Sequence, residues 1–230
     1  MSDILTSSAY FGAALSVCAY VIGMKVQSRF KIAIANPLFI SILLVIATLS
    51  FSGIDYESYN ASAKYLGYFL TPATVCLAIG LYEQLSLLKT NAIAIILGIL
   101  SGIICSALGV LLLAAIFTLP HSMYVTLLPK SITSAIGMEV SSALGGIPSI
   151  TVAVIILSGI VGNMFAIFFC RVMKISSPIA KGIAIGSSSH AIGTAKAIEM
   201  GDIEGAMSGL SVAVSGVLSV IFINIFALIY

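Results

Sequence analysis

Two short polar stretches interrupt a chain that is otherwise almost entirely hydrocarbon. The first covers 128–139 and contains Lys130 and Glu139, and the second covers 186–196 and contains His190. Hydroxyl, imidazole and charged groups are costly inside a lipid bilayer, and in membrane segments they mark substrate paths and proton relays. The two stretches are therefore the candidate working site.

The first stretch is predicted to break a helix. Pro129 disfavours helix at the residue before it and removes a backbone donor. Ser131 or Thr133 is then expected to cap a new half-helix, whose free N–H groups and dipole attract an anion. Lys130 would add a full positive charge at that point, so a small carboxylate is the expected ligand.

The second stretch is predicted to break in the same way. Gly186 is followed by three serines, 187–189, a sequence typical of a chain break and a helix cap. A half-helix is expected to open here and to run through Glu199, with His190 in its first turn. A free imidazole titrates near neutral pH, so this histidine is a candidate for proton exchange.

The expected substrate ligands are the polar residues at the two breaks, namely Lys130, Ser131, Thr133, Ser187, Ser188, Ser189, His190 and Thr194. Proton coupling or charge pairing is expected from the ionisable groups Glu139, His190, Lys196 and Glu199. Structural alternatives stay open for these residues. A hydroxyl inside a membrane helix often bonds back to a carbonyl of its own helix. Lys130 can extend toward the membrane interface, and Lys196 and Glu199, three residues apart, can neutralise each other.

Composition places the elements that must hold these residues in a membrane. Of the 230 residues 60% are hydrophobic and 8% charged, too few polar groups to cover a water-soluble globule. Six uncharged runs approach or exceed the roughly 18–20 residues that cross a bilayer, at 4–24, 32–54, 65–82, 90–120, 140–170 and 205–230. The first is read as a retained span rather than a leader, since no basic region precedes it. The predicted fold class is an all-α, polytopic integral membrane protein.

The chain also repeats itself. A shift of 57 residues places 70–103 on 127–160 without a gap, and 12 of the 34 pairs are identical, including Pro72 on Pro129. A fainter copy follows, with Ala-Ile-Gly at 191–193. Chance similarity of Ile- and Leu-rich sequence is the alternative. We expect one transmembrane domain over 1–230, with units at about 8–60, 61–118, 122–174 and 181–230, as in secondary transporters.

Charge predicts that these repeats are inverted. The basic loops around Arg29 and Lys174 should both be cytoplasmic, but five full crossings between them would put them on opposite faces. The segment 122–143, with a proline, two charges and seven Ser or Thr residues, is therefore expected to be re-entrant or broken. A unit of one re-entrant element and one span crosses once, so successive units alternate in direction. The alternative is that one basic loop violates the positive-inside tendency.

The polar stretches resemble those of the LrgB/CidB family of bacterial membrane proteins. The resemblance covers essentially the whole chain and is carried by Pro129-Lys130-Ser131 through Glu139, by 145–148 (Gly-Gly-Ile-Pro), by 188–197 with Glu199, and by 204–206. Membership implies an antiholin-like protein of the bacterial cell (inner) membrane that acts with a small LrgA/CidA-like partner. The related plant plastidic protein exchanges glycolate and glycerate, and bacterial relatives are linked to pyruvate uptake.

Together these observations predict a secondary transporter of C2–C3 monocarboxylates, such as pyruvate, glycolate or glycerate, coupled to protons and assembled as a homodimer. The alternative function is that of an antiholin-like regulator of a holin-like partner, which modulates murein hydrolases and autolysis without carrying solute. We expect no enzyme activity, because no Ser–Lys or HExxH arrangement fits the spacing. No metal or cofactor and no nucleic acid is expected as a partner. The cysteines, 18, 76, 105 and 170, are predicted to be packing residues rather than disulfides or ligands.

Overall fold

A computed structural model describes the chain except for residues 1–9, 31–34, 70–71, 73–74, 77–78 and 80–81. The described residues are helical, with turns and short connections between the helices, and no strand occurs among them. They form two compact units, Met1–Cys76 and Leu77–Tyr230. In this part of the chain four helices are long and apolar enough to cross a membrane: α2 (Phe11–Phe30), α7 (Ala92–Phe117), α10 (Pro148–Val172) and α12 (Asp202–Ala227). The protein is thus an all-helical, multi-pass membrane protein.

The first unit is a helical hairpin with a short helix packed on it. It consists of α2, α3 (Pro37–Ser52), α4 (Tyr56–Ala63) and the 3-10 helix η2 (Lys64–Phe69). Gly12 lets the backbones of α2 and α4 approach, and its N–H donates to Ser62 Oγ at 2.6 Å. Within the apolar run predicted at 32–54, the structure has the 16-residue helix α3, which is shorter than the roughly 20 residues of a perpendicular crossing. The run at 65–82 lies partly outside the described residues.

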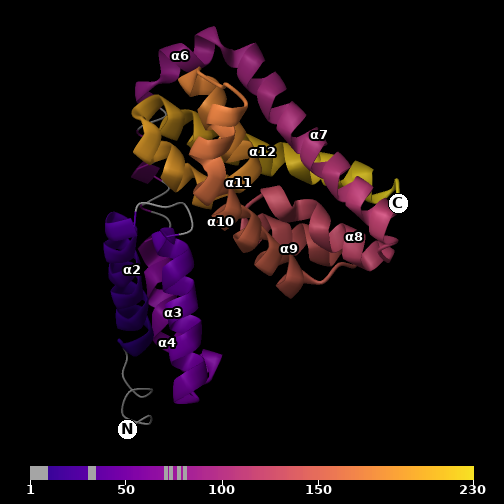
Figure 1. Cartoon of the computed structure of the whole chain (residues 1–230). Helices are drawn as coiled ribbons and strands as arrows, with labels where there is room; N and C mark the ends of the chain where they lie inside the picture. The colour runs from indigo at the N-terminus through magenta and orange to yellow at the C-terminus, as the bar shows by residue number, and fades with distance from the viewer. Residues whose placement is uncertain (1–9, 31–34, 70–71, 73–74, 77–78, 80–81) are drawn as a thin grey trace. The chain divides into compact units, whose positions relative to one another are not determined.

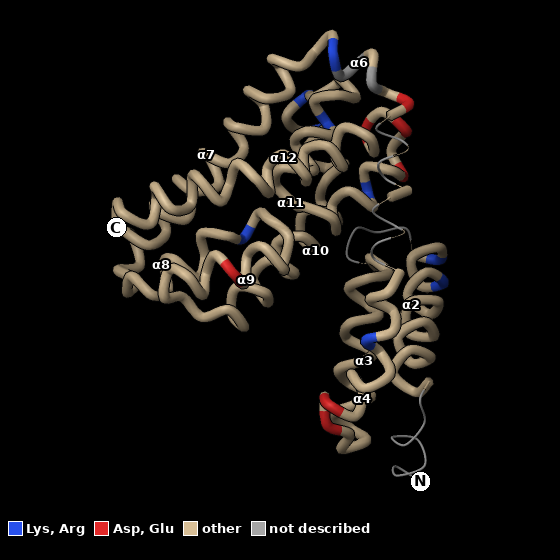
Figure 2. Tube along the Cα trace, turned by 180° about the vertical axis from the view of Figure 1, so that it is seen from behind, with Lys and Arg blue, Asp and Glu red and all other residues tan. Residues whose placement is uncertain are grey.

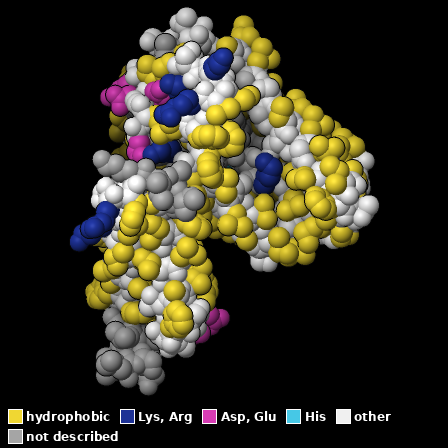
Figure 3. Space-filling view, viewed as in Figure 1, with side chains coloured by type: hydrophobic (Ala, Val, Ile, Leu, Met, Phe, Trp, Pro, Cys, Tyr) yellow, Lys and Arg dark blue, Asp and Glu magenta, His cyan; other side chains and the backbone are white. Residues whose placement is uncertain are grey.

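The second unit contains α6 (Leu85–Thr90), α7, α8 (His121–Leu127), the 3-10 helix η3 (Leu128–Ser131), α9 (Ser134–Ala143), α10, α11 (Pro178–Met200) and α12. Lys and Arg gather with most of the acidic residues at the end that carries α6, as Figure 2 shows. We refer to this as the charged end. The opposite end holds residues 112–128, 140–152 and 220–230, among which there is no Lys, Arg, Asp or Glu. We refer to it as the apolar end. Hydrophobic side chains cover much of the visible surface (Figure 3), as expected beside lipid.

The segment 121–143, which contains the element predicted at 122–143 to be re-entrant or broken, is a re-entrant hairpin, and we call it the first hairpin. Helix α8 ends before Pro129, η3 follows, and α9 starts after Thr133. Thr151 Oγ1 donates to Thr126 O at 2.9 Å and to Ser141 Oγ at 2.7 Å, so the two arms lie side by side. Ser131, at the turn, contacts Ser106 in the middle of α7. The chain therefore enters from the apolar end, reaches mid-helix depth and returns.

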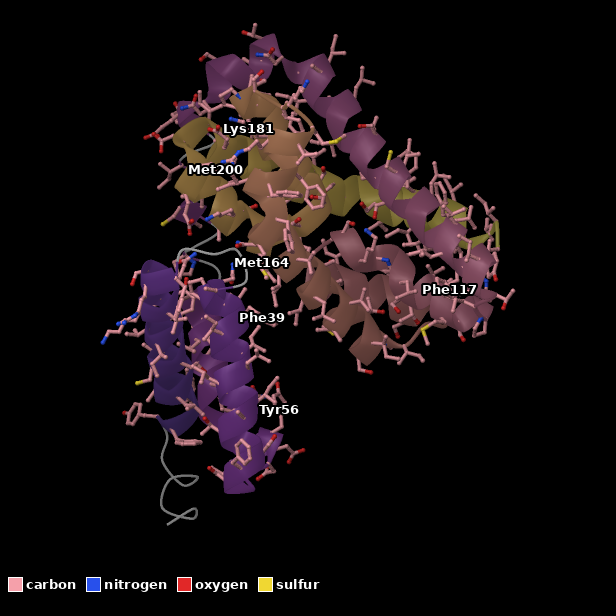
Figure 4. All side chains as sticks on the ribbon, in the orientation of Figure 1. Phe39, Tyr56, Phe117, Met164, Lys181 and Met200 are labelled. Carbon is pink, nitrogen blue, oxygen red and sulfur yellow. The ribbon has the colours of Figure 1, made fainter. Side chains whose placement is uncertain are left out.

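Helix α11 consists of two helical arms separated by a break, and together they form a second hairpin. A straight helix of its 23 residues would be about 35 Å long. Lys181, near its start, and Met200, at its end, lie close together in Figure 4. Lys181 Nζ also lies 3.7 Å from Glu204 Oε1, just beyond that end. The reversal is at His190, whose φ and ψ are 42° and −143°.

The two hairpins and the helices after them are inverted repeats. A shift of 57 residues places the start, break and end of the first hairpin (121, 133, 143) on those of the second (178, 190, 200). Helix α10 begins at the apolar end, where Thr151 contacts α8. Helix α12 begins at the charged end, where Glu204 contacts Lys181. The equivalent helices thus run in opposite directions, as predicted, whereas the boundaries of the four units stay a prediction.

Candidate functional site

A cavity of about 680 Å³ lies inside the second unit, between α7, α11 and the turn of the first hairpin. Its walls consist mainly of small and polar residues: Asn91, Ala94, Gly98, Ser101, Gly102, Cys105, Ser106, Lys130, Ser131, Ser177, Ile179, Ala180, Ile183, Ala184, Ser187 and Ser188. Four of the eight predicted substrate ligands are among them: Lys130, Ser131, Ser187 and Ser188. The structure therefore brings residues from both polar stretches to one cavity.

Lys130 supplies the only positive charge among the residues that line this cavity. It is half-buried, and its Nζ donates to Ser131 Oγ at 3.2 Å. Ser131 Oγ in turn lies 2.7 Å from Ser106 Oγ of α7. In the described part of the chain the ion pairs are Lys181–Glu204 and Lys196–Glu199, so no carboxylate there neutralises Lys130. A partly desolvated ammonium group without a counter-ion favours the binding of an anion.

The second hairpin forms the facing wall of the cavity, but its helix breaks at a different residue from the one predicted. The break was expected at Gly186, whereas the chain stays helical through Ser189 and breaks at His190. Ser187 Oγ donates to Ile183 O and Ser188 Oγ to Ala184 O, both at 2.7 Å, within their own helix. The prediction of helix-start N–H donors at 187–189 is therefore wrong. These hydroxyls satisfy the helix carbonyls and present lone pairs to the cavity.

The other four predicted ligands lie outside the cavity. Thr133 is the residue before α9, and its side chain makes no capping bond. Ser189 packs against Gly162 of α10 and lies 3.1 Å from Ser188 Oγ. Thr194 donates to His190 O and lies 2.8 Å from Ser208 Oγ of α12. Ser189 and Thr194 thus hold the second hairpin against α10 and α12.

His190 is buried at the turn of the second hairpin rather than exposed to the cavity. Its Nε2 lies 2.9 Å from the carbonyl oxygen of Ile155 in α10. A β-carbon at Gly159 would collide with the ring, so α10 needs glycine there to approach the turn. The histidine thus fixes the reversal of the chain, and its role in proton coupling stays a prediction.

The remaining ionisable candidates are peripheral. Glu139 is exposed on α9, away from the cavity wall. Lys196 Nζ lies 2.6 Å from Glu199 Oε2. The two side chains therefore neutralise each other, which was the structural alternative to a role in proton coupling. No three His, Cys, Asp or Glu side chains come together as metal ligands would within the residues that the structure describes.

Sequence reasoning missed the contribution of α7. Ser101, Cys105 and Ser106 line the cavity, but they lie in a run that reads as a plain membrane span. The signal available was the small-residue pattern around Gly98 and Gly102. The side chain of Ser187 packs against Gly102 and that of Ile183 against Gly98, so both glycines are close helix contacts, and both also border the cavity. Cys105 is a free thiol in the cavity wall rather than a packing residue.

Inverted repeats, two re-entrant hairpins and a polar cavity between them define a class of membrane protein built like the secondary transporters. Residues 16–229 match the LrgB-like family. The chain is 38% identical to the antiholin-like protein LrgB of Bacillus subtilis (strain 168), over 96% of each sequence. It is 36% identical to the proteins of the same name from Bacillus cereus (strain B4264) and Bacillus anthracis (strain CDC 684 / NRRL 3495), again over 96% of each. No solved structure matches. The chain belongs to the LrgB-like family.

Proposed function

We propose that this protein acts in the bacterial cell (inner) membrane as an antiholin-like regulator, together with a small LrgA-like membrane partner. The observation that carries this proposal is the near-complete match to relatives named antiholin-like protein LrgB. Of the two functions expected from the sequence, the comparisons support this one more directly. The four long apolar helices fit a partner that is itself in the membrane.

The test of the regulatory proposal is autolysis in a host that lacks its own LrgB-like protein. Expression of the chain with its LrgA-like partner should slow the loss of turbidity after membrane depolarisation, and expression of either protein alone should not. Co-purification of the two proteins in detergent would support a direct complex. Unchanged lysis together with no complex would contradict this function.

A second candidate function is favoured by the cavity. Lys130 has no acidic partner among the described residues and lies where the two inverted repeats meet. A scaffold gains nothing from a half-buried lysine, because burial of an unpaired charge costs free energy. The position between inverted repeats is where secondary transporters bind their substrates. We therefore propose that the protein also binds and carries small monocarboxylates of the pyruvate, glycolate and glycerate class, coupled to protons.

Transport is tested with the purified protein in liposomes. Uptake of radiolabelled pyruvate or glycolate should exceed that of protein-free liposomes, should saturate, and should respond to an imposed pH gradient. The Lys130→Met protein provides the matched inactive control, because the side chains are of similar length. Uptake equal to that of empty liposomes would reject transport by this chain alone and leave the regulatory function standing.

A further inference from the structure

The residues that line the cavity extend from one end of the second unit to its middle. Asn91 and Ser177, which line its outer part, precede α7 and α11 at the charged end. Lys130 and Ser188 line its inner part, at the turns of the two hairpins or just before them. A solute therefore has a path from the charged end to the middle of the unit. An excess of Lys and Arg marks the cytoplasmic side, so this path faces the cytoplasm.

Beyond Lys130 the same helices leave no path. The second half of α7 packs against α8 and the end of α12 through buried apolar side chains: Ala107, Val110, Ala114, Tyr124, Val125 and Phe226. The exposed fraction of each is 8% or less. Close-packed hydrocarbon of this kind excludes a hydrated carboxylate. One helix, α7, thus borders a cavity along its first half and a closed core along its second.

The repeat relates the open half to the closed half. The 57-residue shift places Ala180 and Ala184 of the second hairpin on Met123 and Leu127 of the first. The two alanines line the cavity. Leu127 packs against the apolar core, and Met123 is half-buried. Equivalent positions of two inverted hairpins are therefore open at one end of the unit and closed at the other.

The bonds that hold each hairpin to α12 obey the same relation. Tyr124 corresponds to Lys181, and each contacts one end of α12. Tyr124 OH donates to Phe226 O at 2.9 Å, and Lys181 lies 3.7 Å from Glu204. Tyr230 OH adds bonds to Ala114 O and Leu119 O at the apolar end. The apolar end thus has its own set of contacts that would have to open.

We propose that the cavity is the inner half of a two-sided solute path, and that the other half lies between α7 and α8. That half is closed in this structure and is lined by Ser122, Met123, Thr126 and Leu127, the counterparts of the cavity wall. If each hairpin opens while the other is closed, a small carboxylate held at Lys130 passes from one face of the membrane to the other. This inference rests on the transport candidate, because a regulator needs no second half.

The test uses single cysteines in sealed vesicles of both orientations and a charged, membrane-impermeant thiol reagent. Cys18, Cys76 and Cys170 are replaced by Ala in every protein. Native Cys105 reports on the cavity. Ala184→Cys and Leu127→Cys, each in a protein that also carries Cys105→Ala, report on equivalent positions of the two halves.

Cys105 and Ala184→Cys are expected to react only from the charged face. Leu127→Cys is expected to react only from the opposite face, and several-fold faster when Tyr124→Phe removes the bond to Phe226. Reaction of Leu127→Cys from the charged face would overturn the inference. So would no reaction from the opposite face, with and without Tyr124→Phe, while Ala184→Cys reacts.

Pyruvate flux measured in the same vesicles separates the two levels of the proposal. Pyruvate flux without any reaction of Leu127→Cys from the face opposite the charged end would overturn the proposed second half of the path but not transport. Reaction of Leu127→Cys from the face opposite the charged end, without pyruvate flux, would reject transport but would still show that the first hairpin opens.

Discussion

The two hairpins share a plan but differ in the chemistry at their turns. In the first, Pro129 ends α8, a 3-10 turn follows, and the break carries the charge of Lys130 to the cavity. In the second, helix continues to Ser189 and reverses at a single residue, His190, with φ of 42°. The first hairpin therefore offers a charged donor to a ligand, and the second offers self-bonded hydroxyls and a tightly packed turn.

If the transport proposal holds, the first hairpin serves ligand binding and the second serves packing. Residues of the first turn contact the cavity and few glycines, whereas the second hairpin meets α10 and α12 through glycines that leave no space for a side chain, such as Gly162, Gly182 and Gly186. Substitutions in the first hairpin should change affinity, and those in the second should change stability.

Replacement of Lys130 should have the largest effect on ligand binding. A charge-assisted hydrogen bond contributes about 1.5–3 kcal/mol, so Lys130→Met should weaken pyruvate binding about 10- to 100-fold. Lys196→Met, which removes a lysine already paired with Glu199, is the matched control and should leave the affinity unchanged. Equilibrium binding to the purified proteins measures both, and equal affinities would place the anion elsewhere.

Added methyl groups should distinguish the packing of the two hairpins. A β-carbon at Gly186 would meet the backbone of Ser208 and lie 2.8 Å from Ser211 Cβ, whereas one at Gly137 would meet the flexible end of Ile155. We expect Gly186→Ala to cost about 1–3 kcal/mol by overpacking and Gly137→Ala to cost less than about 1 kcal/mol. Thermal unfolding in detergent measures both, with Gly209→Ala, which has open space, as the control. Equal losses would contradict the difference in packing.

The two breaks should respond to glycine with opposite signs. His190 has a positive φ, which favours glycine over alanine by roughly 1 kcal/mol or more. Thr133 has φ of −67° and ψ of 148°, an ordinary extended conformation, where glycine should be worse than alanine by about 0.4–1 kcal/mol. We therefore expect His190→Gly to unfold at a higher temperature than His190→Ala, and Thr133→Gly at a lower temperature than Thr133→Ala. The same sign at both positions would show that the breaks are alike.

Loss of single hydroxyls should have the smallest effects. Ser131→Ala removes the contact between Lys130 and Ser106 and should weaken pyruvate binding about 2- to 10-fold. Ser188→Ala removes a hydroxyl that bonds to its own helix and should change affinity less than about 2-fold. A larger effect of Ser188→Ala would move the ligand toward the second hairpin.

The long-range plan of the second unit was predictable from the sequence. Pro129 requires a break, and the 57-residue repeat implies equivalent units. The two basic loops can share the cytoplasmic face only if the number of crossings between them is even, which implies a segment that does not cross. The number of crossings between the basic loops stays a prediction, because it also depends on residues 70–81, only part of which the structure describes. Length and apolarity were sufficient to predict α7, α10 and α12.

The site was only half predictable, because side-chain direction depends on tertiary contacts. Ser187, Ser189 and His190 are near neighbours in sequence, yet the first faces the cavity and the other two face α10. The position of the second break depends on how closely α10 approaches, which local sequence does not encode. Cys105 looked like packing material because its neighbours from α11 and η3 are far away in sequence.

Protection of Cys105 tests most directly whether the cavity around Lys130 is the anion site. In a protein with Cys105 as its only cysteine, the rate of thiol modification is measured at increasing pyruvate concentration. We predict a saturable decrease in rate that shifts to about 10- to 100-fold higher pyruvate in the Lys130→Met protein. A rate that is independent of pyruvate, or protection that is identical in the two proteins, would contradict the account.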